Sequence, residues 1–149
     1  MEIKTFTFNP FLENTYVLYD DTRECVIVDA GCYEEKEKKA LVDFIAENNL
    51  DPVKLVNTHC HIDHVFGLRF LADKYKLGLW FHQADMPVFT STEMVAKMYE
   101  LPGVELPPEP AGFIEEGDKI AFGNSNLDVL FTPGHSPGHV VFVNQHQKQ

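Results

Sequence analysis

Residues 58–64, THCHIDH, place three histidines, one aspartate and one cysteine in seven consecutive positions. The apolar run that leads into this stretch, residues 53–59, favours a buried strand, and residues 65–75 favour a helix. Side chains this polar between two buried elements would cost desolvation energy without return unless they formed a site. The chain is therefore expected to turn here and to present these groups at the end of a strand.

The spacing within this stretch indicates a metal site. His59 and His61 are two residues apart at a predicted strand end, so their imidazoles project to the same side while Cys60 points away. Asp63 and His64 follow where the chain turns into a helix, which can bring a carboxylate and a third imidazole beside the first pair. Imidazole with carboxylate suits zinc, iron or manganese, and the lack of paired cysteines argues against a closed structural zinc site.

Two other interpretations of the stretch stay open. A shuffled sequence of this composition would contain H-x-H-x-D-H only about once in 1000 tries, so chance explains the pattern poorly. The histidines could nevertheless be core residues bonded to the backbone, with Asp63 capping a helix. Cys60 could instead be a nucleophile with a histidine as its base, although neighbouring strand residues face opposite ways.

A second polar cluster, 132-TPGHSPGH-139, lies near the end of the chain. Its glycines and prolines predict a tight turn at a strand end that holds two histidines four residues apart. His135 lies within the turn and is the natural further metal ligand. His139 opens the next strand and is more typical of a supporting or core histidine.

Three more residues are candidates for the same metal site. Asp29 ends the apolar strand 25–31 and could accept a hydrogen bond from a ligating imidazole, or could simply belong to a turn. His82 more naturally starts the short segment 82–87 than binds metal. His146 lies in a polar tail and carries no signal.

The order of elements predicts an α/β fold with helices layered on sheet. Strands at 2–8 and 15–20 open the chain, and strand and helix then alternate before three closing strands. The proline-rich stretch 102–112 is expected to be a long connection between two halves. The predicted strands after the first two are 25–31, 53–59, 77–81, 117–122, 127–132 and 139–144, and the predicted helices are 34–49, 65–75 and 87–99.

Composition limits the classes of protein that this chain can belong to. The 149 residues, 44% apolar and 23% charged, predict one globular domain over 1–149. Three cysteines without paired spacing predict no disulfide framework and a cytoplasmic location. We expect no targeting segment and no membrane association, since no apolar run approaches the ~20 residues that span a bilayer. A net charge of −11 disfavours nucleic acid as a partner.

The motifs 26-VIVDAG-31, 58-THCHIDH-64 and 132-TPGHSPGH-139, in this order, resemble those of the metallo-β-lactamase-fold hydrolases. The match is closest to the glyoxalase II-like (hydroxyacylglutathione hydrolase-like) branch and covers nearly all of the chain. The resemblance implies an αββα sandwich with a site for one or two Zn²⁺ ions at its edge, Fe or Mn being possible. By that resemblance one metal is held by His59, His61 and His135, and the second by Asp63 and His64.

The resemblance also implies a chemistry, in which a metal-activated water attacks a small-molecule thioester or ester. Asp63 is the expected catalytic residue, since it would orient the water and pass a proton to the leaving group. Two alternatives remain for this chain. It could be a metal-binding module without catalysis, or a mononuclear iron protein that oxygenates a thiol or persulfide.

The chain departs from the family pattern after 132–139. Family members continue to a strand that ends in an aspartate bridging the two metals, and later to one more histidine. This chain shows neither, so it resembles a truncated member with an incomplete C-terminal half, in which the second metal would bind weakly. Exposed sheet edges and apolar surface would follow, and we expect a homo-oligomer that covers them.

Overall fold

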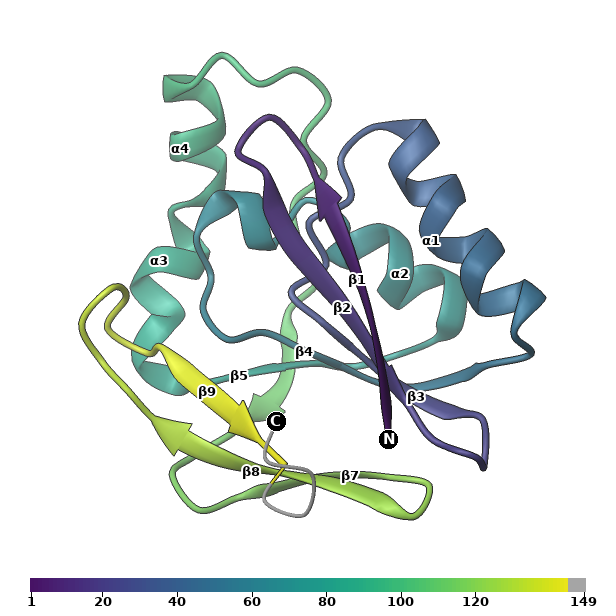
Figure 1. The fold of residues 1–149 in the computed structure, drawn as a ribbon. Coiled ribbons are helices and arrows are strands. Elements are labelled where there is room, and N and C mark those ends of the chain that lie inside the picture. The colour runs from purple at the N-terminus through teal and green to yellow at the C-terminus, as the bar shows by residue number, and fades with distance from the viewer. Residues whose placement is uncertain (145–149) are drawn as a thin grey trace.

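The computed structural model describes residues 1–144 and arranges them in three layers (Figure 1). Helices cover one face of a six-stranded sheet, and a three-stranded sheet packs on its other face. These layers are the α, β and β layers of the predicted αββα sandwich, and the α/β fold class is confirmed. None of the helices in residues 1–144 contributes to the core between the two sheets.

The first sheet has its strands in sequence order. Its first three strands are antiparallel, whereas the third to sixth are parallel to one another. Parallel strands bring their C-terminal ends to one edge, where sites form in open α/β sheets. The strands are β1 (Glu2–Phe8), β2 (Glu13–Tyr19), β3 (Glu24–Val28), β4 (Asp51–Val56), β5 (Leu79–Phe81) and β6 (Pro110–Phe113).

The second sheet is an antiparallel set of three strands that accounts for the predicted closing strands. The helices join the strands of the first sheet, and two short 3-10 turns precede α2 and α3. The strands are β7 (Lys119–Phe122), β8 (Ser125–Phe131) and β9 (Val140–Val143). The helical segments are α1 (Glu35–Glu47), η1 (Ile62–His64), α2 (Leu68–Tyr75), η2 (Gln83–Asp85), α3 (Met86–Thr90) and α4 (Thr92–Met98).

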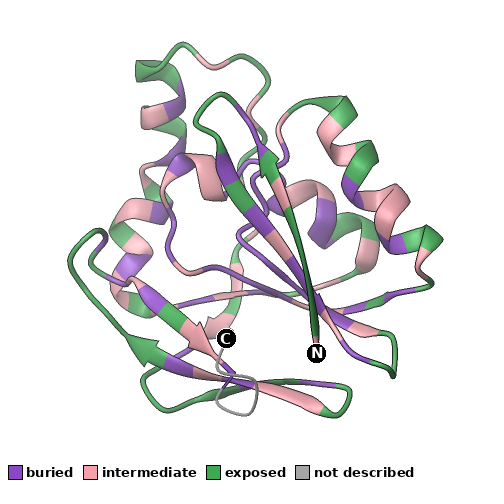
Figure 2. Cartoon of the chain, in the orientation of Figure 1, coloured by how far each residue is buried: buried purple, intermediate pink, exposed green. Residues whose placement is uncertain are grey.

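The strand β3 shows why the sequence of a central strand of the first sheet is a continuous apolar run. Cys25 and Ile27 pack into the core beneath the helices, and Val26 and Val28 pack into the core between the sheets. Because both faces of this strand are covered, no polar residue alternates with the apolar ones. Figure 2 shows buried residues along the central strands and exposed residues on the outer helix faces and the loops.

The helix α1 forms where the sequence predicts it. The Glu37 side chain accepts a hydrogen bond from the backbone N–H of Glu34, and the two residues form a capping box at the start of the helix. Leu41 and Ile45, four residues apart, are its buried residues. The apolar stripe therefore faces the sheet, and the charged residues face solvent.

Two predicted segments differ from the structure by more than the position of an end. The single helix expected at 87–99 is split into α3 and α4 at Ser91, whose hydroxyl donates to the carbonyl of Val88. Hydroxyl groups that bond back to the helix in this way compete with its regular pattern. The stretch 102–112, expected to be only a connection, ends in β6, which adds a sixth strand beside β5.

The described part of the chain contains no helix of the length and apolar character that a bilayer crossing needs.

Candidate metal centre

The fold brings two polar segments together at one edge of the sandwich. Residues 57–61 follow the end of β4, and residues 132–139 connect β8 to β9. His59, His61 and His135 each offer one ring nitrogen, and these nitrogens all lie within 4.8 Å of one another. The Nδ1 atom of His61 and the Nε2 atom of His135 are 3.1 Å apart. Three of the predicted ligands therefore form one tight cluster.

His59 lies at the centre of this cluster in a form suited to a metal. Its Nδ1 atom is 3.0 Å from the hydroxyl of Thr58, while its buried Nε2 atom has no hydrogen-bond partner among the described residues. Burial, reinforced by the surrounding histidines, lowers the pKa of His59 to about 3. A neutral imidazole with one free nitrogen is what a cation requires, so the donor set fits a divalent metal.

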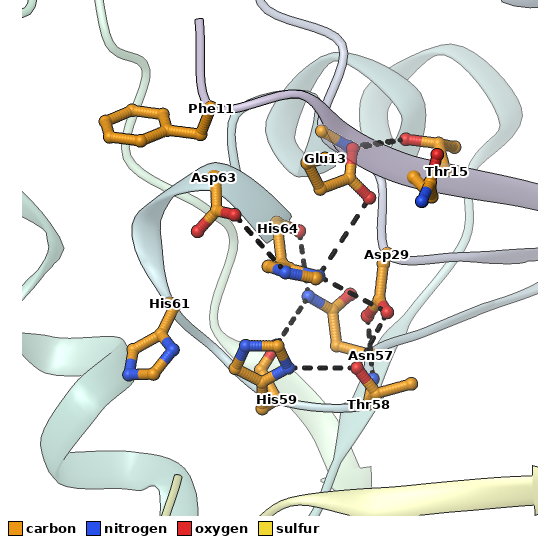
Figure 3. Close-up of polar contacts among 12 residues, drawn as sticks. Phe11, Glu13, Thr15, Asp29, Asn57, Thr58, His59, His61, Asp63 and His64 are labelled. Carbon is orange, nitrogen blue, oxygen red and sulfur yellow. Dashed lines mark hydrogen bonds and ion pairs between the residues drawn. The ribbon is translucent and has the colours of Figure 1, made fainter. Parts of the chain in front are cut away.

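Asp63 and His64 lie beside the cluster and contact each other (Figure 3). The Nε2 atom of His64 is 3.4 Å from Asp63, and its Nδ1 atom is 3.3 Å from Asp29. Burial opposes the charged form, but the two carboxylates raise the pKa of His64 to about 10. The same contact lowers the pKa of Asp63 against the effect of its burial. His64 thus lies between two carboxylates that favour its charged form.

Asp29 holds the histidine segment against the end of β3. It accepts hydrogen bonds from the backbone N–H and the hydroxyl of Thr58, both at 2.7 Å. Its backbone has a left-handed φ of 53°, so it also forms the turn after the strand. Asp29 therefore forms the turn, as one of the two interpretations predicted, and its carboxylate also lies next to the His64 ring.

Glu13, at the start of β2, is a further buried carboxyl group in this region (Figure 3). It accepts a hydrogen bond from the hydroxyl of Thr15, and its Oε1 atom lies 3.9 Å from His64 Nδ1. Burial raises the pKa of Glu13 to about 9. A Cβ atom at Gly31 would lie 2.0 Å from its Oε2 atom, so this close approach requires glycine.

Asp85, a fully buried residue at the end of η2, joins the two polar segments. One carboxylate oxygen accepts a hydrogen bond from the backbone N–H of Cys60. The other accepts from the hydroxyl of Ser136 and, at 2.8 Å, from the backbone N–H of Gly138. A Cβ atom at Gly138 would lie 2.5 Å from the Asp85 backbone nitrogen. This single carboxylate therefore bonds to the chain next to His59 and to the chain next to His135.

His82 and His139 lie outside the three-histidine cluster. The Nδ1 atom of His139 is 2.9 Å from the hydroxyl of Thr132, and its ring centroid is 5.2 Å from that of His59, a supporting position. His82 accepts a hydrogen bond from the Ala84 backbone and begins η2, as its sequence context predicts. His146 lies outside the described residues.

Cys60 is unsuited to the role of a nucleophile. Its side chain is buried, and burial raises the pKa of its thiol further above neutrality. A protonated, inaccessible thiol is a poor nucleophile.

Sequence reasoning missed Glu13 and Asp85. Each is a single acidic residue without a surrounding motif, and each acts through partners distant in the chain. Asp85 contacts residues 51 and 53 positions away. The only local signal for Asp85 was its place in the segment 82–87, which the sequence marks as the start of a new element.

The chain matches the model of the metallo-beta-lactamase superfamily over residues 8–148. It is 29% identical to the hydroxyacylglutathione hydrolase GloC of Haemophilus influenzae over 150 residues, which cover 100% of this chain and 68% of that protein. It is 31% identical to a probable metallo-hydrolase, YqgX, of Bacillus subtilis, with 95% of this chain and 65% of that protein covered.

A solved structure agrees with these sequence relatives. The crystal structure of TTHA1623 in a di-iron-bound form superposes with a TM-score of 0.81 at 32% identity, over 97% of this chain and 68% of that one. The chain thus spans about two thirds of the length of these relatives. A family match over nearly all of the sequence, together with the fold and the clustered histidines, shows that the chain belongs to the metallo-beta-lactamase superfamily.

Proposed function

We propose that this chain is a metal-dependent hydrolase that cleaves a thioester or an ester. One observation carries the proposal: the ring nitrogens of His59, His61 and His135 converge within 4.8 Å from two separate segments. Three protein ligands that leave further positions open are a catalytic type of site. The similarity to hydroxyacylglutathione hydrolases supports the thioester as the bond that is cleaved.

The proposed metal is zinc, with iron or manganese as alternatives. Imidazole ligands accept all three, and the similarity to a di-iron-bound structure supports iron as the first alternative. We assign His59, His61 and His135 to one ion, and Asp63 and His64 to a second, weaker position. A bound divalent cation polarises a carbonyl group and makes water nucleophilic near neutral pH.

The chain's own residues supply the remaining chemistry. Asp63 is half-buried, and its lowered pKa keeps it ionised at neutral pH. It can therefore accept a proton from the attacking water and deliver it to the departing thiol or alcohol. Asp29 and Asp85 act as positioning residues, because they fix the segments that carry the histidines.

The proposal is tested with chain that has been stripped of metal and reloaded separately with zinc, ferrous iron or manganese. Hydrolysis is measured on a panel of acyl thioesters, lactones and phosphodiesters. We expect thioester or ester hydrolysis that a chelator abolishes and added metal restores. Absence of chelator-sensitive hydrolysis on every substrate would overturn the proposal. Oxygen uptake with thiol or persulfide substrates on the iron-loaded chain would instead indicate an oxygenase.

A further inference from the structure

A cavity of about 530 Å³ opens directly beside the histidine cluster. Its volume falls in the range of ordinary small-molecule pockets. Residues 60–63, which include His61 and Asp63, form part of its wall, and the rest comes from the turn between β1 and β2 and from residues 87–99, which contain α3 and α4. The cavity is therefore continuous with the candidate metal centre, and a molecule bound in it would reach the proposed reaction site.

The side chains that line this cavity are mainly apolar. Val88 and Val95 come from the two short helices, and Phe11 packs edge-to-face on Tyr99 with ring centroids 5.6 Å apart. No lysine or arginine is among the lining residues. The hydroxyls of Ser91 and Thr92 donate to backbone carbonyls of α3 and are not free to donate to a ligand. This cavity is suited to a hydrocarbon group and offers no cation to a carboxylate.

A second hollow of about 400 Å³ also has Phe11 and Asp63 in its wall, so the two cavities meet at these side chains. His59, His64 and the buried carboxyl group of Glu13 line it as well, so this hollow contains the candidate metal centre. The site thus has an apolar cavity beside the hollow that would hold the metal, with the proposed proton carrier, Asp63, in the wall of both.

We propose that the 530 Å³ cavity binds an uncharged aliphatic or aromatic acyl chain of the substrate. This assignment rests on the proposed hydrolase function. The thioester bond then lies next to Asp63 and the histidine cluster. Hydrolysis breaks the bond between the carbonyl carbon and the sulfur, adds the oxygen of water to the carbonyl carbon and transfers a proton to the departing thiolate.

Charge excludes acidic acyl chains from this cavity. A carboxylate at the end of the chain would lose its hydration and would gain no cationic partner from the lining residues. Asp63 contributes a negative charge at the wall, and the whole chain carries a net charge of −11. A neutral acyl chain therefore binds better than an acidic one of the same length.

The first experiment compares S-acyl-N-acetylcysteamine thioesters on the metal-loaded chain. From acetyl to hexanoyl, kcat/KM is expected to rise about threefold per added methylene, because each buried methylene gains transfer free energy. The succinyl thioester is expected to fall at least about tenfold below its neutral counterpart, pentanoyl. A series that is flat with chain length, or a preference for succinyl, overturns the assignment.

Substitutions of residues that line the 530 Å³ cavity test whether the preference for longer acyl chains arises there. Val95→Phe and, separately, Val88→Phe narrow the cavity, so the ratio of hexanoyl to acetyl kcat/KM should fall towards one. Met94→Phe is the matched control, since Met94 neighbours Val95 on α4 but is 65% exposed and does not line the cavity. Far-ultraviolet circular dichroism checks that each variant is folded. An unchanged ratio in both folded valine variants would count against the assignment.

A binding measurement on metal-free chain separates this inference from the proposed function. S-hexanoyl-N-acetylcysteamine is titrated against chain with labelled valine methyl groups, and the methyl resonances of Val88 and Val95 are expected to shift. Methyl shifts without hydrolysis in any metal-loaded form would overturn the hydrolase function and leave the cavity assignment standing. Hydrolysis without methyl shifts at Val88 or Val95 would overturn the cavity assignment alone.

Discussion

At the scale of single residues, the candidate metal centre depends on side chains that fix the histidines as much as on the histidines. His59 is buried and neutral, with one nitrogen against Thr58 and the other free. Asp85 bonds to the backbone on both sides of the cluster. Such supporting contacts orient metal ligands, and their loss typically costs 10–100-fold in metal affinity. Two variants test the two roles separately.

Replacing His59 with alanine removes a proposed ligand. We expect the affinity for Zn²⁺ to fall by more than about 100-fold, beyond what the loss of a supporting partner causes. Equilibrium dialysis with elemental analysis measures the affinity. His82→Ala serves as the control, because His82 lies outside the three-histidine cluster. Equal affinities in the His59 and His82 variants would show that His59 is no ligand.

Replacing Asp85 with asparagine keeps the shape of the side chain but exchanges one acceptor oxygen for an N–H₂ donor. This donor then faces another donor, which is either the Cys60 N–H or the pair formed by the Ser136 hydroxyl and the Gly138 N–H. A buried donor then lacks an acceptor, so the free energy of unfolding should fall by about 1–3 kcal/mol. Zn²⁺ affinity should fall 10–100-fold as the two segments loosen. Chemical denaturation and dialysis measure the two effects, with the exposed Asp73→Asn as control. Unchanged affinity would contradict the positioning role.

The sequence predicted the histidines but not the residues that support them. His59, His61 and His135 lie in two dense motifs whose spacing can be interpreted without coordinates. Glu13 and Asp85 are isolated acidic residues, and their burial exists only because distant segments close around them. Whether a carboxylate is solvated or fully buried depends on tertiary packing, which no local pattern encodes.

At the scale of elements, the turn after β2 contacts the turn between β7 and β8 and so joins the two sheets, at the end away from the connection between β8 and β9 (Figure 1). Asp20, which follows β2, accepts hydrogen bonds from the backbone N–H of Thr22 and of Asn124, at 3.0 and 2.8 Å. The hydroxyl of Ser125 donates to it at 2.9 Å. The Asp20 carboxylate thus links the two turns, and Glu24 adds a further link by accepting a hydrogen bond from the backbone N–H of Gly123.

Replacing Asp20 with alanine should lower the free energy of unfolding by about 1–3 kcal/mol at pH 7, because the donors at Thr22, Asn124 and Ser125 lose a charged acceptor. Burial acts to raise the pKa of Asp20, but the hydrogen bonds from Thr22, Ser125 and Asn124 lower it overall in the folded chain. The carboxylate therefore stabilises the fold above its ordinary pKa of about 4, and this contribution is lost as the pH falls through the lowered value.

Urea denaturation of wild type and variant at pH 7 and at successively lower pH measures this effect. The difference between the two proteins should be largest at pH 7 and should shrink under acid conditions. Asp21→Ala is the control, because Asp21 is the adjacent, exposed residue. A difference in the free energy of unfolding that grows as the pH falls would contradict a stabilising role for the Asp20 carboxylate.

The elements themselves were largely predictable because their apolar spacing is strong. The central strands and α1 were predicted directly from the sequence. The division of 87–99 into α3 and α4 was missed because it depends on hydroxyls that bond back to nearby carbonyls. The strand β6 was missed because it lies in a proline-rich stretch and pairs only with β5, an association between distant segments.

At the scale of the whole molecule, the acidic chain carries an apolar groove next to its proposed cation site. The groove, about 340 Å³, is lined by Ile3 of β1, by residues of β2, β3 and β9, and by Thr58 and His139 beside the histidine cluster. Ile3 and Val141 are 42% and 39% exposed. Unpaired edges and exposed apolar side chains are features that favour association.

We accordingly expect this chain to form a homo-oligomer through β1 and β9. Multi-angle light scattering at micromolar concentration should give at least twice the 17.0 kDa mass of one chain. Val141→Lys places a charge on the edge strand β9 and should shift the mass towards the monomer. A monomeric wild-type chain at that concentration would contradict this prediction.

The central claim is that His59, His61 and His135 bind one metal ion. Anomalous scattering at the zinc edge, from a crystal of this chain grown with Zn²⁺, tests it most directly. We expect one strong anomalous peak within bonding distance of His59 Nε2, His61 Nδ1 and His135 Nε2. The absence of a peak between these three rings, or zinc bound only elsewhere, would contradict the claim.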